Sequence, residues 1–431
     1  MKRLYKNANV LLPDHTVLAG AVGTDGPLIS MVGAAPSDVS GWNEVVDLHG
    51  AVLMPGLVNA HGHSAMTLLR GLGAGLPLQR WLEEAIFPVE AKLTPADVKI
   101  GMTWAVMEML ASGTTLVADM YDFPEAGAEA LFETGFKANV CRVGLDFPWA
   151  PGTPDGRLDE CIAFTRGFKD PTGKVVADFC LHSEYLTLEQ FVRAIAEANG
   201  DLRRPVHLHV SETEKEHAEC ISRHGVTPTA YFAGLGLLDH GGYLAHCVFA
   251  TDDDFGLMRD KGASIVHNPT SNMKLGSGFA RIPSARAAGA NVALGTDGCA
   301  SNDNLDMFEE VHLAYLIHKG ISRDPTVLPA WDVIDMATVC GARALGRTDV
   351  GAIAVGMRAD FCAVSLDSPH MRPAYDLPAL LVASAHGSDV VMTVVDGEIL
   401  YDHGEYPTID AGRAEFEFRQ TARRLRGKEI A

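Results

Sequence analysis

From Pro55 onward, short apolar runs alternate regularly with longer helical segments, and this rhythm limits the folds open to the chain. Such alternation is typical of βαβ units that build a parallel sheet. Eight strand-like runs over roughly 240 residues fit a (β/α)8 barrel of the TIM type, whose usual size is about 250 residues. An open doubly wound sheet is the weaker alternative, because no run is followed by a G-x-G-x-x-G turn. The predicted strands are LVNAHGH, which ends at His63, and residues 114–121, 138–145, 175–182, 206–212, 243–249, 263–269 and 291–298.

The two ends of the chain have a different pattern, in which short β-runs follow one another with turns between them. Asp396-Gly397 is typical of a two-residue hairpin turn. We therefore expect both ends to form one small β-sandwich domain, interrupted by the barrel. The predicted division is 1–54 for the first part of the sandwich, 55–350 for the metal-dependent barrel, and 351–431 for the second part with a C-terminal helix.

The charge and cysteine content narrow the class of protein. A formal net charge of −20 argues against binding nucleic acid or an anionic membrane. No apolar run approaches the roughly 20 residues of a membrane helix, and the N-terminus lacks the pattern of a secretory signal. The eight cysteines show no C-x-x-C pair, which favours reduced thiols and a cytoplasmic protein.

Histidines gather where the predicted strands end. His61 and His63 point to the same face of their strand, because side chains alternate along a strand. One H-x-H pair is also common in cores and on surfaces. Functional residues of such barrels, however, lie at the C-terminal ends of the strands. Seven of the 17 histidines occupy such ends, namely His61, His63, His182, His207, His209, His246 and His267.

These residues can be sorted by chemistry. His61, His63 and His209 with Asp297 can form a mononuclear site of three imidazoles and one carboxylate, a set that suits zinc or iron. A metal there would lower the pKa of a bound water toward ~7. Glu212, three residues after His209, suits a proton shuttle. His246 suits a residue that orients the attacking water or stabilises developing charge.

Two absences narrow the chemistry further. A binuclear hydrolase of this type would need a bridging lysine at the end of the fourth strand, where this chain has Cys180-Leu181-His182, so we expect one metal ion. A cytidine-deaminase zinc site needs H-x-E followed by P-C-x-x-C, and the chain has no C-x-x-C. His207 lies deeper than His209 at the wrong offset from Glu212, so we expect it to be structural.

The motifs PGLVNAHGH, HLHVSETEKE, HNPTSNMKLGSG and NVALGTDGCASNDNLDMFEE, together with His246, resemble the amidohydrolase superfamily over almost the whole chain. They are most similar to its S-adenosylhomocysteine/5′-methylthioadenosine/5′-deoxyadenosine deaminase branch. The resemblance implies that one zinc ion per subunit, or Fe2+ or another divalent ion, is held by His61, His63, His209 and Asp297. It also implies a homo-oligomer, either a dimer or a tetramer.

Further roles follow from the resemblance alone. Glu212 would pass a proton to the ring nitrogen, and His246 with Asp297 would deprotonate the water. The residues implied to bind the nucleoside are Glu90, at the ribose hydroxyls, Arg142, His182 and Glu212. From its local sequence alone, Glu90 would be an exposed helix residue and Arg142 a member of a buried ion pair.

The chain departs from the branch around His182, where P-H-[SA]-P-Y-T is replaced by Leu181-His182-Ser183-Glu184-Tyr185-Leu186. We expect Glu184 to bring negative charge near the pocket and to affect the choice of 5′ substituent. The predicted function is hydrolytic deamination of an adenine nucleoside substrate. The alternatives are deamination of a free purine, pterin or pyrimidine base, triazine dechlorination, and a non-catalytic assembly protein on the same scaffold.

Overall fold

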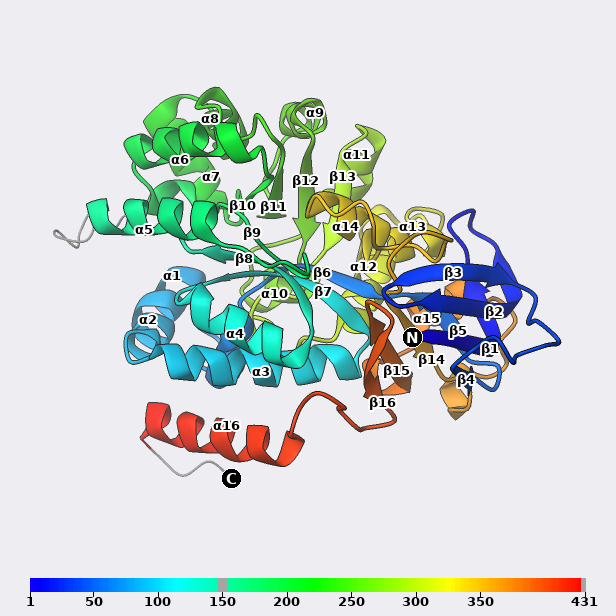
Figure 1. Cartoon of the computed structure of the whole chain (residues 1–431). Coiled ribbons are helices and arrows are strands. Elements are labelled where there is room, and N and C mark those ends of the chain that lie inside the picture. Colours follow the sequence, from blue (N-terminus) through cyan, green and yellow to red (C-terminus); the bar gives the residue numbers. More distant parts are fainter. Residues whose placement is uncertain (146–153, 428–431) are drawn as a thin grey trace.

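The computed structural model describes residues 1–145 and 154–427 and contains a barrel beside a smaller sheet domain (Figure 1). The barrel has the eight strands that the sequence predicts. They are β6 (Leu57–Gly62), β7 (Thr114–Tyr121), β8 (Lys137–Arg142), β9 (Val175–Ala177), β10 (Val206–Val210), β11 (Gly242–His246), β12 (Ala263–His267) and β13 (Asn291–Leu294).

The barrel closes through two seams between groups of four parallel strands. Strands β6 to β9 pair in chain order, and so do β10 to β13. At one seam Cys180, beyond the short strand β9, forms a parallel bridge with His207 of β10. At the other, the backbone N–H of Asp297 donates to the carbonyl of His61 at 2.9 Å. The first seam therefore lies beside His209 on β10, and the second joins two predicted metal ligands, His61 and Asp297.

Helices follow most of the barrel strands and cover the barrel (Figure 1). The helix α3 shows how the sequence sets its ends: Thr94 and Asp97 form a capping box, and Gly113, at φ 85°, follows the last turn. The helices of the barrel region are α1 (Leu78–Arg80), α2 (Phe87–Glu90), α3 (Pro95–Ala111), α4 (Pro124–Thr134), α5 (Pro154–Gly167), α6 (Glu189–Leu202), α7 (Glu214–His224), α8 (Pro228–Gly234), α9 (Asp252–Lys261), α10 (Pro269–Lys274), α11 (Ile282–Ala287), α12 (Met307–Ser322), α13 (Ala330–Met336) and α14 (Val339–Ala344).

The chain ends form one hydrogen-bonded sheet of eight strands rather than two separate sheets. The strands of the two chain ends join where β5 pairs antiparallel with β14, and the long β1 pairs with β4 along its first half and with β5 along its second half. Tyr5 and Phe361 meet edge to face in its core, with ring centroids 4.9 Å apart. The strands are β1 (Lys2–Leu11), β2 (Val17–Asp25), β3 (Leu28–Gly33), β4 (Glu44–Asp47), β5 (Val52–Pro55), β14 (Phe361–Val364), β15 (Val390–Val395) and β16 (Glu398–Asp402). The predicted hairpin turn between β15 and β16 is present, with positive φ at Asp396 and Gly397.

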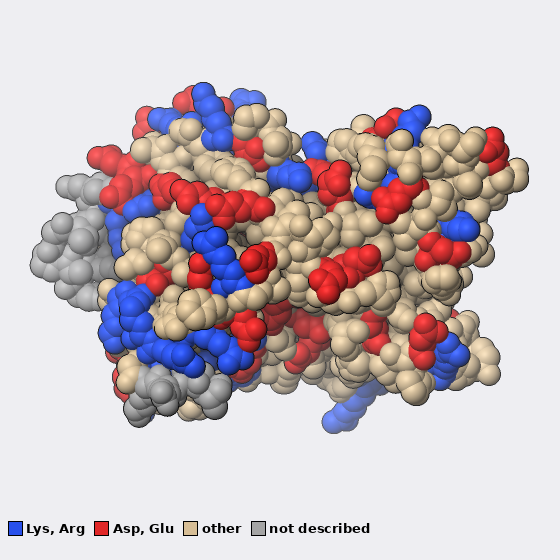
Figure 2. Space-filling view, turned by 60° about the horizontal axis from the view of Figure 1, so that its bottom comes forward, with Lys and Arg blue, Asp and Glu red and all other residues tan. Residues whose placement is uncertain are grey.

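Two further helices follow the barrel region, α15 (Leu377–Ala383) and α16 (Ala411–Arg426). The last of them, α16, lies against the barrel and not on the sheet domain that precedes it. Phe418 of α16 stacks on Trp104 of α3, and Arg424 binds Asp97 at 2.5 Å. Figure 2 shows basic side chains gathered beside the chain's C-terminal end, where the last turn of α16 carries several arginines. Positive charge at this end of a helix complements its dipole. None of the helices in the described parts of the chain is long and apolar enough to cross a membrane.

A buried ion cluster joins the barrel to the sheet domain. Lys137 begins β8, and its ammonium group contacts Asp360 at 2.5 Å and Asp396 at 2.8 Å. Arg358 also binds Asp396, at 3.0 Å. The Lys137 and Asp360 side chains are each only 1% exposed. Removing one partner of such a cluster leaves an uncompensated charge in the interior.

We expect Lys137→Met to lower the free energy of unfolding by about 3–5 kcal/mol, because Asp360 would lose the ammonium group that it contacts and Asp396 would keep only Arg358. Urea titration followed by circular dichroism measures the change. Lys99→Met is the matched control, since Lys99 pairs with Glu133 at the surface, where an ion pair contributes about 0–1 kcal/mol. A loss for Lys137→Met no larger than that of the control would contradict the prediction.

Candidate metal centre and active site

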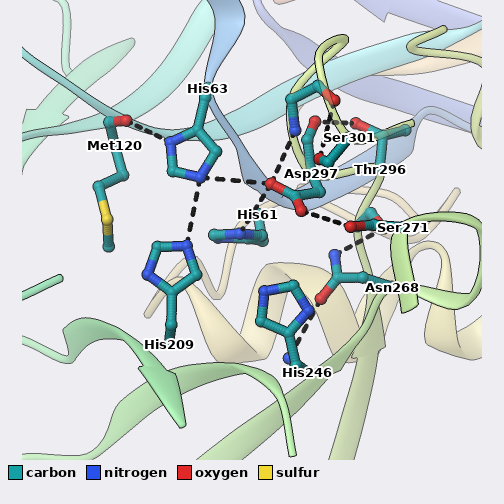
Figure 3. A network of polar contacts seen from close by, with 12 residues as sticks. His61, His63, Met120, His209, His246, Asn268, Ser271, Thr296, Asp297 and Ser301 are labelled. Atoms are coloured by element: carbon teal, nitrogen blue, oxygen red, sulfur yellow. Dashed lines mark hydrogen bonds and ion pairs between the residues drawn. The ribbon is translucent and has the colours of Figure 1, made fainter. Parts of the chain in front are cut away.

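Four side chains converge at the C-terminal mouth of the barrel (Figure 3). His61 comes from β6 and His63 directly follows that strand, while His209 comes from β10 and Asp297 from the loop after β13. Their candidate ligand atoms all lie within 4.8 Å of one another. His63 Nε2 is 3.2 Å from His209 Nε2, and Asp297 Oδ1 is 3.4 Å from His61 Nε2. A tetrahedral zinc ion needs ligand atoms roughly 3.3 Å apart, so the arrangement fits a metal ion.

Backbone carbonyls orient two of the imidazoles. The Nδ1 atom of His63 lies 2.6 Å from the carbonyl oxygen of Met120, and that of His209 lies 2.8 Å from the carbonyl oxygen of His182. A carbonyl only accepts, so each Nδ1 carries the proton and donates it. Each Nε2 then presents a lone pair to the centre, as in most histidine metal sites.

His61 is oriented by another histidine. Its Nδ1 lies 2.7 Å from His207 Nε2, and His207 Nδ1 lies 3.8 Å from the sulfur of Cys141. The buried Nε2 of His61 has no hydrogen-bond partner in the described residues, and a metal ion at the centre would satisfy it. His207 therefore lies directly behind the cluster, outside the four candidate ligands, and its structural role stays a prediction. His267 lies outside it, with His318 at 3.3 Å.

Asp297 supplies the negative charge of the cluster. Burial alone would raise its pKa, but the contacts of Asp297 Oδ1 with the imidazoles of His61 and His63, at 3.4 and 3.3 Å, hold that pKa well below the usual range. Its second oxygen accepts a hydrogen bond from the Ser271 hydroxyl at 2.7 Å. One ionised carboxylate among three imidazoles is a donor set for zinc or a similar divalent ion.

Glu212 and His246 lie beside the cluster without joining it. Glu212 Oε2 is 3.9 Å from His246 Nε2, and the hydroxyl of Ser277 donates to Glu212 Oε1 at 3.4 Å. Burial raises the pKa of Glu212. His246 Nδ1 lies 2.9 Å from the side-chain oxygen of Asn272, which directs Nε2 toward Glu212. The sequence reasoning did not single out Asn272, although it lies in the HNPTSNMKLGSG motif.

One cavity connects this cluster with Glu90 and His182. Glu90 lines the cavity and accepts a hydrogen bond from the Tyr121 hydroxyl at 2.7 Å. Burial raises the pKa of Glu90, an effect that the Tyr121 bond partly offsets. The His182 ring stacks on His209, with centroids 4.4 Å apart. Apolar side chains, including that of Trp81, complete the walls, so the cavity offers a flat aromatic ligand both apolar and polar contacts.

Arg142 does not line this cavity. Its guanidinium contacts Glu160 at 2.5 Å and Glu125 at 3.7 Å, and its side chain is 19% exposed. In this structure Arg142 is therefore not placed to contact a nucleoside in the cavity. Arg142 does form an ion pair, but its partner Glu160 is 54% exposed, so the pair is not buried as its local sequence suggested.

The expectation for Glu184 was wrong. Its carboxylate is buried away from the cavity, where Arg223 binds it at 2.5 Å and His224 Nε2 lies 2.8 Å away. Both partners belong to α7. The departure from the P-H-[SA]-P-Y-T pattern thus adds a contact to α7 and brings no negative charge into the cavity.

Comparison with known proteins gives consistent matches. The model of the amidohydrolase family matches residues 52–400. The chain is 40% identical to a 5-methylthioadenosine/S-adenosylhomocysteine deaminase of Acetivibrio thermocellus, over 99% of this chain and 100% of that protein. It is 39% identical to a 5′-deoxyadenosine deaminase of Methanosarcina mazei, over 98% of each. A solved structure of an adenosine deaminase from Xanthomonas campestris with bound zinc has a TM-score of 0.91 and 34% identity, over 99% of both chains.

Proposed function

Because the chain belongs to the amidohydrolase family, we propose that it is a metal-dependent hydrolytic deaminase of adenine nucleosides. Its substrates would be S-adenosylhomocysteine, methylthioadenosine, 5′-deoxyadenosine or adenosine, and its products ammonia and the inosine-type nucleoside. The observation that carries the proposal is the shared cavity, in which a hydrolytic cluster and the buried carboxylate of Glu90 lie together. The names of the full-length relatives support it.

The proposed metal ligands are His61, His63, His209 and Asp297. We propose one zinc ion per subunit, while Fe2+ or another divalent ion would suit the same donors. A bound ion would supply Lewis acidity and lower the pKa of a water toward ~7.

The remaining chemistry is proton transfer by the side chains around the cluster. Asp297 and His246 would accept the proton of the attacking water as its oxygen bonds to C6 of adenine. Glu212 would donate a proton to the adjacent ring nitrogen, and burial, which raises the pKa of Glu212, favours the protonated form that this step needs. The exocyclic amine then takes up the proton that came from the water, the C6–N bond breaks and ammonia leaves, and the C6 hydroxyl returns a proton to Glu212 as the carbonyl forms.

Substrate orientation would depend on Glu90 and His182. The Glu90 carboxylate can accept hydrogen bonds from both vicinal ribose hydroxyls, while Tyr121 holds one of its oxygens. His182, beside the ligand His209, would contact the nucleoside. Arg142 would have to release Glu160 and Glu125 to reach a substrate, so we leave it out of the proposed site.

The proposal includes a cytoplasmic location, which the eight buried free thiols support, and a dimer or tetramer. Ammonia release by the zinc-loaded protein tests the reaction. The panel holds S-adenosylhomocysteine, methylthioadenosine, 5′-deoxyadenosine, adenosine, adenine, guanine, cytosine and a chlorotriazine scored by chloride. Turnover confined to the nucleosides is expected. Turnover of only free bases or the triazine would be consistent with the proposed metal chemistry but would contradict the proposed nucleoside substrate.

Glu90→Gln tests the contact with the ribose. We expect kcat/KM for adenosine to fall by about 10- to 100-fold, because a charged acceptor contributes about 1.5–3 kcal/mol. Turnover of 2′,3′-dideoxyadenosine, which lacks both hydroxyls, should change by less than about threefold. Glu83→Gln, an exposed change in the preceding turn, is the matched control. An unchanged kcat/KM on every active substrate would remove the nucleoside assignment.

A further inference from the structure

The carboxylate of Glu216 is buried near the site and has no role in the proposed mechanism. This residue lies in the first turn of α7, and it is only 5% exposed. Thr213 caps the helix by accepting a hydrogen bond from the N–H of Glu216 at 3.2 Å. A glutamate at this position usually returns to the N–H of the capping residue itself.

The Glu216 carboxylate reaches further back along the chain. Oε1 accepts a hydrogen bond from the N–H of Ser211 at 3.0 Å, and Oε2 accepts one from the N–H of Glu212 at 2.7 Å. Ser211 has a left-handed backbone conformation, φ 51°, which costs about 1–3 kcal/mol for a non-glycine residue. A buried carboxylate is therefore used to hold a strained bend between the ligand His209 and Glu212.

This bend sets the direction of the Glu212 side chain. After His209 the chain turns at Ser211, and Glu212 then lies in the cavity 3.9 Å from His246. Among the described residues, the only hydrogen bond to the Glu212 carboxylate itself is a long one, from Ser277 at 3.4 Å. Control of its position must therefore come largely from the backbone. Proton transfer is sensitive to such placement, since an error of about 1 Å can cost roughly 100-fold in rate.

We propose that Glu216 is a positioning residue, whose carboxylate fixes the Ser211–Glu212 backbone and so holds Glu212 where it transfers protons. The inference rests on the proposed function, because it requires Glu212 to act on the substrate. Glu216 touches neither substrate nor metal.

Glu216→Gln is the first test, since it preserves shape but directs an amide NH2 group at one of the two backbone N–H groups. We expect kcat to fall by about 10- to 100-fold, with KM changed less than about twofold and one metal ion per subunit retained. Glu214→Gln makes the same charge change at an exposed position of the same turn and should leave kcat unaltered. Glu216→Asp, which keeps the charge but shortens the reach, should also lower kcat.

A double-mutant cycle separates positioning from general stability. In a Glu212→Gln background, Glu216→Gln should cost less than about twofold, because the group that it positions no longer transfers protons. An equal loss in both backgrounds, no loss in the native background, or loss of the metal would overturn the proposal. The proposed function fails separately, if Glu212→Gln alone keeps full activity on every substrate that the protein turns over.

Discussion

His209→Ala is expected to remove bound metal and activity together. The change withdraws one of the three imidazoles, and the loss of this protein ligand weakens the binding of the ion. We expect less than about 0.1 metal ion per subunit after dialysis, and a fall in kcat of more than about 1000-fold, because activation of water by the ion contributes several kcal/mol. Elemental analysis and ammonia release measure the two effects on the same preparation.

The matched control is His267→Gln, which alters another buried histidine at the end of a barrel strand. His267 contacts His318 and lies outside the cluster, so metal content and kcat should stay within about threefold of the native values. If His209→Ala kept a full complement of metal, the proposed ligand set would be wrong. Equal losses in both variants would instead indicate general damage to the barrel.

The barrel and its cluster could be predicted because their signals are local. Each strand is a short apolar run, and alternation along a strand places His61 and His63 on one face whatever surrounds them. His209 and Asp297 could be added because parallel strands bring their C-terminal ends to the same mouth of a barrel. In the structure the four ligand atoms lie within 4.8 Å of one another.

The contacts that could not be predicted join residues far apart in the chain. Glu184 is neutralised by Arg223, 39 residues later, and no local pattern distinguishes this arrangement from a carboxylate facing the cavity. An ion pair was expected for Arg142, but its partner Glu160 lies 18 residues later, on α5, and could not be identified from the sequence. The hydrogen bond from the Ser211 N–H to Glu216 joins residues close in sequence. It departs from the usual capping contact, however, so the sequence alone did not predict it.

Glu212→Gln is expected to lower kcat by about 100- to 10,000-fold while the metal stays bound, since Glu212 is not a ligand and its proton transfer contributes about that much. Glutamine keeps the shape of the side chain but cannot give up and regain a proton, so water would have to protonate the ring nitrogen. KM should change by less than about threefold. Stopped assays of ammonia release and elemental analysis give all three quantities.

The result for Glu212→Gln also shows whether Glu212 or His246 donates the proton to the ring nitrogen. Ser277→Ala, which removes only the long hydrogen bond to Glu212, should lower kcat by less than about fivefold and serves as the control. If Glu212→Gln instead kept most of the activity, the proton would have to come from His246, whose Nε2 lies 3.9 Å from the same carboxylate. His246→Gln would then show the larger loss, and the roles proposed for the two residues would exchange.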